Sequence, residues 1–274
     1  MTSSTTNFPV QSLGESGSLW DMTRHSWVTT FIGAGGKTTC LRTLTRDLEA
    51  AGLEVVATTT TKVYPESSLE AWKNHYPPPH HQGAWFWYEG AEDSVGKWIG
   101  PSALAVDEAI AEELKTDSRR YWVIEGDGAR ERRLKCWEYY EPQIPKYSDC
   151  GVLVIDKGLW GRVLDSDAVH RPQKCQEFLG EIWNAENAWR YLLKSPVFDS
   201  QYSLMSWVVL FNSARTVSGA GEFGPENSFD LLSDLRLGWD DILGESPGTD
   251  VKPSHLRLAE GDAKRGDLRW FDLW

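Results

Sequence analysis

The sequence predicts an α/β fold, in which a largely parallel sheet is flanked by helices in three layers and followed by an irregular C-terminal extension. Two observations support this class. Short apolar runs alternate with stretches of helical spacing, the order typical of βα units. A glycine-rich turn also joins the first apolar run to the first helical stretch. No apolar run approaches the roughly 20 residues of a membrane span.

The predicted elements follow one another in β–α order. Residues 28–32 form the first strand, and residues 38–51 form the first helix because Leu41, Leu44 and Leu48 recur at helical spacing. The next predicted elements are strands over residues 53–57 and 85–89, a helix over 101–114, strands over 121–125, 151–156 and 207–212, a short helix over 229–237, and a closing hairpin within 255–274.

Chain organisation follows from these elements. Residues 1–18 are expected to be a flexible lead-in, and residues 19–274 a single domain. Within it, residues 215–274 form a divergent C-terminal segment, where the stretches 217–228 and 243–254 are rich in Gly, Ser and Glu. Fifteen tryptophans are expected mainly to fill the core or lie half-buried at the surface.

Composition excludes several classes of function. A formal charge of −12 argues against an extended nucleic-acid surface, which needs clustered Lys and Arg. The four cysteines show no CxxC pairing, so the spacing favours neither a disulfide scaffold nor a zinc site. The N-terminus resembles neither a secretory signal nor a transit peptide. We therefore expect a cytoplasmic protein with no membrane partner.

The glycine-rich turn is the most informative motif. At the start of a helix, its backbone N–H groups, the helix dipole and Lys37 favour phosphate, and the Thr38 hydroxyl suits the Mg²⁺ that accompanies a nucleotide. Phe31 replaces the first glycine of a Walker A motif, which leaves the shorter GxxGKTT form of Mur-type and folate polyglutamate ligases. A turn that binds nothing is the alternative. The predicted cofactor-binding residues here are Gly33, Ala34, Gly35, Gly36, Lys37, Thr38 and Thr39.

Two further motifs follow predicted strands, whose carboxyl ends gather at one edge of a parallel sheet. Thr60 and Lys62 follow the second strand and suit a phosphate, although threonines also favour a plain strand extension. Glu125 ends the strand over 121–125 and Asp127 follows it; the pair suits a nucleotide-bound Mg²⁺, with an ordinary Asp-Gly turn as the alternative. Thr38, Glu125 and Asp127 are the predicted metal ligands, and Lys37, Glu125 and Asp127 the predicted catalytic residues.

Basic residues come next along the chain. Arg130 and Lys135 lie in a run of four cations within six residues, which could bind a phosphorylated or carboxylated substrate or form a solvated loop. His170 and Arg171 form a second polar cluster, although a lone histidine is usually structural. These four residues are the predicted contacts to a second substrate.

The ordered motifs resemble the YqeC family, accessory proteins of selenium-dependent molybdenum hydroxylases. The matching blocks are residues 32–39, 58–62, 123–129, 134–135, 141–142, 144–145 and 169–172. The family has an Asn-Lys-x-Asp-like segment after its late strand, where this chain reads Phe211-Asn212-Ser213-Ala214. Without that lysine and aspartate, ATP is favoured over GTP.

The resemblance implies an Mg-dependent, P-loop-type nucleotide-binding protein that assists maturation of a molybdenum hydroxylase, as an NTP hydrolase or phosphotransferase. Its partners would be a molybdenum-cofactor intermediate, a hydroxylase or another maturation protein. A Mur-like ligase or small-molecule kinase is one alternative. A non-catalytic, nucleotide-gated delivery protein with exposed tryptophans and an acidic surface is another.

Overall fold

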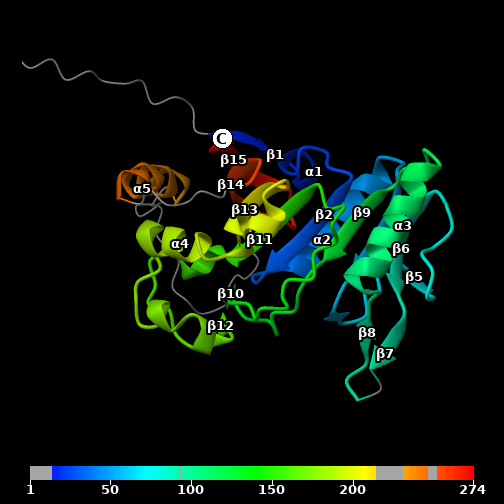
Figure 1. The fold of residues 1–274 in the computed structure, drawn as a ribbon, viewed down its shortest axis with the longest axis horizontal. Coiled ribbons are helices and arrows are strands. Elements are labelled where there is room, and N and C mark those ends of the chain that lie inside the picture. The colour runs from blue at the N-terminus through cyan, green and yellow to red at the C-terminus, as the bar shows by residue number, and fades with distance from the viewer. Residues whose placement is uncertain (1–13, 93, 214–230, 246–251) are drawn as a thin grey trace, which may run out of the picture.

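One ten-stranded sheet organises the protein. The computed structural model describes residues 14–92, 94–213, 231–245 and 252–274. The strands of the sheet are β1 (Glu15–Gly17), β2 (Val28–Gly33), β3 (Glu54–Thr59), β5 (Glu70–Lys73), β6 (Gly83–Tyr88), β9 (Tyr121–Glu125), β11 (Cys150–Asp156), β13 (Ser206–Asn212), β14 (His255–Asp262) and β15 (Asp267–Asp272). Their spatial order is β1-β15-β14-β13-β11-β2-β9-β3-β6-β5 (Figure 1).

Most of this sheet is parallel. All neighbouring strands from β14 to β5 pair in parallel, and the antiparallel pairs β14–β15 and β1–β15 lie at one edge. The glycine-rich turn follows β2, which lies near the middle of the parallel part between β11 and β9. The predicted α/β class with a largely parallel sheet is confirmed.

Helices cover both faces of the sheet. They are α1 (Leu19–Met22), α2 (Lys37–Ala50), α3 (Ala103–Lys115), α4 (Ala185–Leu192) and α5 (Leu231–Glu245). Side chains alternate along β11, so Val152 and Val154 pack in the core with α1 and α2, while Leu153 and Ile155 pack with α4 and α5 on the opposite face. Helix α3 packs on a third cluster around Trp87 and Trp122. Because both faces of the sheet are covered, central strands such as β2 and β11 are buried at every position and read as near-continuous apolar runs.

Two small sheets stand apart from the main one. Strands β4 (Lys62–Val63), β7 (Gly90–Glu92) and β8 (Lys97–Ile99) form an antiparallel sheet, which projects from the body next to β6 (Figure 1). Strands β10 (Leu134–Lys135) and β12 (Val169–His170) form a short parallel pair. Both small sheets supply walls of the cavity described below.

The main elements lie close to their predicted positions, and the closing hairpin is confirmed as β14 and β15. The prediction of an irregular C-terminal extension is wrong for these residues, because β14 pairs with β13 and extends the main sheet. Within the predicted lead-in, the expectation of a loose chain is wrong for residues 15–17, because β1 pairs with β15 more than 250 residues along the chain. Residues 1–13 and the Gly-rich stretch 217–228 lie outside the described residues. The helix predicted over 229–237 is described from Leu231 and continues to Glu245.

Candidate functional site

The candidate site lies at the carboxyl ends of β2, β9 and β3, next to the start of α2. The glycine-rich loop, residues 33–36, joins β2 to α2 directly. Gly33 and Gly35 have φ angles of 93° and 91°, which side chains rarely tolerate. A Cβ at Gly35 would lie 2.5 Å from the backbone nitrogen of Asp156. Close packing of the loop against β11 therefore requires glycine.

Part of this loop is already hydrogen-bonded within the protein. The N–H of Gly33 donates to the Asp127 carboxylate, and the N–H of Ala34 donates to the carbonyl of Val154 at 2.8 Å. Of the predicted phosphate-binding residues in this motif, Gly35, Gly36, Lys37, Thr38 and Thr39 line the cavity. Gly33 and Ala34 do not line it and support the loop from behind.

Lys37 is held beneath the loop in a buried charge cluster. Its Nζ donates to the carbonyl of Gly33 at 2.7 Å and lies 3.3 Å from Asp127 Oδ1 and 3.7 Å from Glu125 Oε1. Burial alone would lower the pKa of Lys37, but the two carboxylates outweigh it and raise the pKa. Lys37 is therefore a charged ammonium with its orientation fixed.

Asp127 is the centre of that cluster, and its side chain is fully buried. Besides the N–H of Gly33 and Lys37, it accepts a hydrogen bond from Trp137 Nε1 at 2.8 Å and lies 3.4 Å from Lys135 Nζ. Both carboxylate oxygens are thus occupied. This geometry suits a residue that positions Lys37 better than one that offers a free oxygen to a metal ion.

Thr38 and Glu125 face each other at the cavity surface. The Thr38 hydroxyl donates to Glu125 Oε2 at 2.8 Å, and both residues line the cavity. Burial raises the pKa of Glu125, against the lowering effects of Lys37 and Thr38. A hydroxyl oxygen beside one carboxylate can serve as a pair of ligands for Mg²⁺ when phosphate and water complete the coordination shell. Among the described residues, no group of three or more His, Cys, Asp or Glu could hold a metal ion.

The predicted pair Thr60 and Lys62 is divided by the structure. The Thr60 hydroxyl donates to the carbonyl of Gln143 at 2.6 Å, so it ties two loops together and does not line the cavity. Lys62 begins β4, lines the cavity, and pairs with Glu92 on β7 at 3.2 Å. Lys97 on β8 extends the same wall and lies over the ring of Tyr64.

The four predicted substrate contacts are likewise divided. Arg130, His170 and Arg171 line the cavity, where Arg171 pairs with Glu141 at 2.6 Å. Lys135 has no exposed surface; its Nζ donates to the carbonyl of Gly128 at 2.6 Å and lies near Asp127 and Glu141. Lys135 therefore supports the site from within and does not face the cavity.

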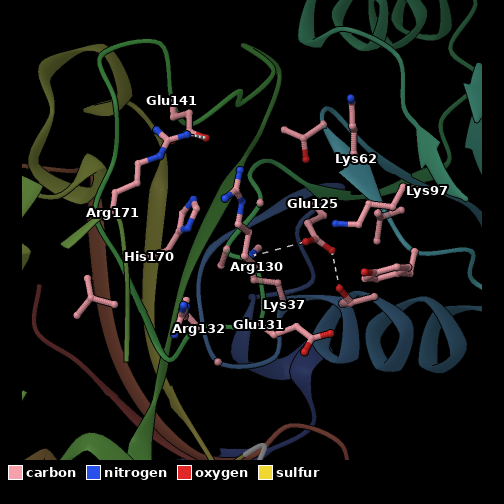
Figure 2. Close-up of a pocket in the computed structure, with 18 of the residues that line it drawn as sticks. Lys37, Lys62, Lys97, Glu125, Arg130, Glu131, Arg132, Glu141, His170 and Arg171 are labelled. Atoms are coloured by element: carbon pink, nitrogen blue, oxygen red, sulfur yellow. Dashed lines mark hydrogen bonds and ion pairs between the residues drawn. The ribbon is translucent and has the colours of Figure 1, made fainter. Parts of the chain in front are cut away.

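These residues surround one open cavity of about 1550 Å³. Figure 2 shows Lys37 and Glu125 near its centre, with Lys62 and Lys97 on one side and His170 and Arg171 on the other. Arg130 lies between these two sides of the cavity (Figure 2). A single small-molecule site usually occupies about 300–1,000 Å³. The cavity is therefore large enough for more than one ligand.

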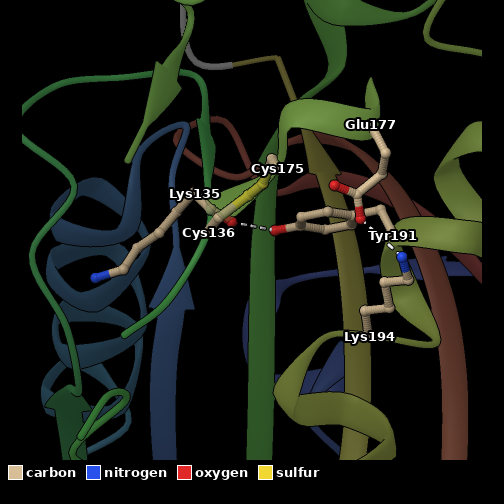
Figure 3. The surroundings of a disulfide bond; sticks show 6 residues. All are labelled: Lys135, Cys136, Cys175, Glu177, Tyr191 and Lys194. Carbon is tan, nitrogen blue, oxygen red and sulfur yellow. Dashed lines mark hydrogen bonds and ion pairs between the residues drawn. A yellow bond between two sulfur atoms is a disulfide. The ribbon is translucent and has the colours of Figure 1, made fainter. Parts of the chain in front are cut away.

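A disulfide fastens one wall of this cavity. Cys136, directly after β10, is bonded to Cys175, five residues after His170, with a Cα–Cα distance of 6.2 Å (Figure 3). The expectation against disulfide pairing is wrong for these two cysteines, because β10 and β12 bring together segments 39 residues apart. Cys40 and Cys150 are free and buried, and burial raises the pKa of each thiol to about 12.

Three supporting residues were missed by sequence reasoning. Trp137 holds Asp127 through its indole N–H. Asp156 packs against Gly35 and is held by Arg133 at 2.9 Å. The Asn212 side chain donates to the carbonyl of Gly35 at 2.8 Å and accepts from the N–H of Ala263. The sequence offered one indication of these residues: each lies at the end of a strand or beside a motif.

The fold and site define an α/β protein with a glycine-rich loop and a buried lysine–carboxylate cluster at the carboxyl edge of a mostly parallel sheet. The family model described as "YqeC protein" matches residues 29–173, which is more than half of the chain. The chain belongs to the YqeC family.

One curated relative shows the same likeness. The Escherichia coli (strain K12) protein named "Uncharacterized protein YqeC" is 30% identical over 165 residues, which cover 56% of this chain and 60% of that protein. The chain thus matches less than two thirds of that relative's length. No solved structure matches at a significant level. Every helix in the described part of the chain is too short or too polar to cross a membrane.

Proposed function

We propose that the chain is a P-loop-type protein that binds a nucleoside triphosphate with Mg²⁺ and uses it in hydrolysis or phosphoryl transfer. The observation that carries the proposal is the placement of Lys37 and Thr38 in the first turn of α2, directly after a central parallel strand and beside Glu125. The N-terminus of a helix offers N–H groups and partial positive charge, which favour phosphate.

Each residue of the cluster has a distinct role in this proposal. Lys37 would exchange its bond to the Gly33 carbonyl for the β- and γ-phosphates, and Asp127 would hold it in place. Thr38 and Glu125 would hold Mg²⁺, which takes one or two protein carboxylates and otherwise keeps phosphate and water ligands. When bound, Mg²⁺ would neutralise charge on the phosphates. Asp127 is thereby reassigned from metal ligand to positioning residue, because its oxygens are already occupied.

ATP remains favoured over GTP in the proposal. Asn212 matches the asparagine of the guanine-reading segment, is 1% exposed, and is bonded within the protein at both ends of its amide. The lysine and aspartate of that segment are absent from the sequence, which is the reason for favouring ATP. The resemblance to hydroxylase accessory proteins supplies the process in which the nucleotide would be used, with a molybdenum-cofactor intermediate or a hydroxylase as partner. The cytoplasmic location stays a prediction.

A ligase or small-molecule kinase is the second candidate, and the size of the cavity favours it, because a nucleotide alone does not need 1550 Å³. Product analysis separates the two: a phosphorylated acceptor or an amide indicates transfer, whereas release of phosphate alone indicates hydrolysis. The delivery hypothesis relied on exposed tryptophans, yet the most exposed of them, Trp27, is 40% exposed and stacks on Tyr121. Tight binding with negligible turnover would favour that hypothesis.

Calorimetric titration of ATP and GTP, with and without Mg²⁺, tests the proposal. We expect Mg²⁺ to strengthen binding of one nucleotide, and Lys37→Ala to weaken it about 10–100-fold, since a charge-assisted contact contributes about 1.5–3 kcal/mol. Lys115→Ala is the matched control, because Lys115 lies on the exposed face of α3 and is 70% exposed. If Lys37→Ala binds as tightly as the wild type while remaining folded by circular dichroism, the phosphate assignment fails. If neither nucleotide binds the wild type, a pterin phosphate is the next ligand to test.

A further inference from the structure

One wall of the cavity has an unusual backbone. The arginine wall, defined here as Arg130, Arg132, His170 and Arg171, is formed by the loop after β9 and by β12 with the residues that follow it. Arg130, Glu131 and Arg171 all have positive φ angles, of 48°, 59° and 64°. Non-glycine residues in this region are costly and gather at functional sites, where the surrounding structure holds them.

The charges on this wall are unevenly compensated. Arg171 pairs with Glu141, and Arg132 bonds to the backbone of Asp167. Arg130 is exposed, and among the described residues no carboxylate or hydrogen-bond partner compensates it. A guanidinium presents a planar set of donors that matches the geometry of carboxylate and phosphate. Arg130 is therefore a cation directed at the cavity without an anion.

His170 lies beside Arg130 and Arg171, and its pKa is affected by the excess of positive charge on this wall. Partial burial, Lys135 on β10, Arg171 and Arg130 lower its pKa to about 4, against the raising effect of Asp127. The imidazole is thus neutral at pH 7 and retains a ring N–H for donation. Figure 2 shows this ring directed into the cavity between the two arginines. An anion bound here would offset the surrounding positive charges and raise the pKa of His170.

We infer that Arg130, His170 and Arg171 form the binding site for an oxyanion, carboxylate or phosphate, carried by a second substrate. Arg130 binds the oxyanion through two N–H groups, and the imidazole of His170 donates the next hydrogen bond. Arg171 is a positioning residue, because Glu141 fixes it and its guanidinium lies over the ring of Tyr140. The inference rests on the proposed nucleotide function for the role of this ligand as a substrate, but anion binding is measurable without nucleotide.

The test follows the imidazole of His170 by NMR during pH titration of the Lys37→Ala chain, with the signal assigned from His170→Gln. Lys37→Ala removes the principal cation of the glycine-rich loop, so a response reports on the arginine wall. Inorganic phosphate and succinate are the probes, and sodium chloride at equal ionic strength is the control. We expect a probe to raise the pKa of His170 from about 4 by about 1–3 pH units, as an opposite charge within a few ångströms does.

Two variants complete the design. Arg130→Gln should abolish the response, whereas Lys97→Gln, on the opposite wall, should keep it. A response to phosphate alone identifies a phosphorylated substrate, one to succinate alone a carboxylic acid, and one to both a general oxyanion site. The inference is overturned if neither probe exceeds chloride, or if Arg130→Gln responds like its parent. If His170 responds but the wild type binds no nucleotide, the proposed function fails and the anion site stands. If the wild type binds nucleotide but His170 does not respond, the anion site fails and the proposed function stands.

Discussion

The inner and outer halves of the cavity treat charge in opposite ways. The inner half, with the cluster that supports it from within, contains Lys37, Lys135 and Asp127, which are almost completely buried; Asp127 lies 3.3 Å from Lys37 Nζ and 3.4 Å from Lys135 Nζ. In the outer half, Arg130 is exposed and without an ion partner in the described chain, and Arg171 retains a strained backbone. The two halves therefore have different roles: the inner charges fix the geometry of the glycine-rich loop, whereas Arg130 in the outer half is available to a ligand.

The strongest way to break this comparison is to remove Asp127. Asp127→Ala leaves two buried lysine ammonium groups without their shared partner, so we expect a loss of about 3–5 kcal/mol in the free energy of unfolding. Urea denaturation measures it. Glu131→Gln, an exposed change on the outer half, should stay within about 0.5 kcal/mol of the wild type. Equal effects from the two variants would erase the distinction between the halves.

Removing the disulfide tests whether the covalent bond stabilises the outer half of the cavity. Cys136 and Cys175 close a long loop, 39 residues apart, and Cys136→Ser should lower the free energy of unfolding by about 2–4 kcal/mol. A reductant should destabilise the wild type comparably and leave Cys136→Ser unchanged. A wild type that loses no stability on reduction would show that the disulfide does not support this wall.

Thr38 tests where the inner half ends, because its hydroxyl lies where the buried cluster reaches the cavity. Thr38→Ala should reduce the Mg²⁺ enhancement of nucleotide affinity about tenfold, corresponding to about 1.4 kcal/mol. Thr39→Ala, which removes the neighbouring hydroxyl, is the matched control and should keep the enhancement in calorimetric titrations. If the Thr39 variant loses the enhancement instead, the assignment of the metal to Thr38 and Glu125 is wrong.

The smallest expected effect concerns pH. His170 has a pKa of about 4 in the folded chain, below its ordinary value of 6.5, so the unfolded chain binds more protons between these values. The contribution of His170 to stability is therefore present above pH 6.5 and is lost as the pH falls towards 4. Because His170 is only partly buried, we reduce its expected contribution to the free energy of unfolding to about 1 kcal/mol. His170→Gln should flatten the stability profile in this window; an unchanged profile would contradict the assigned environment.

The sequence predicted the local elements of the site better than the contacts within its buried cluster. Strand β9 lies at its predicted residues 121–125, and α2 begins within one residue of prediction, because periodicity and the glycine-rich turn are local signals. Local order also located Lys37, Thr38 and Glu125 at one sheet edge. The role of Asp127 as a buried hub was not predictable, since it depends on Trp137 and Lys135, whose approach is set by a loop of irregular backbone.

Long-range pairings account for the remaining differences. The disulfide depends on the β10–β12 pairing, and β1 depends on β15; neither pairing leaves a pattern in adjacent residues. The helix α4 was not predicted, because its eight residues are fewer than the roughly 11–18 over which helical periodicity is read.

Asn212 has a consequence for how much of the chain the site requires. The family match ends at residue 173, but the amide of Asn212 connects the carbonyl of Gly35 to the N–H of Ala263, in the turn between β14 and β15. The C-terminal hairpin is thereby mechanically coupled to the glycine-rich loop. A chain shortened to the family match over residues 29–173 would lack both Asn212 and the hairpin, and therefore this connection to the glycine-rich loop.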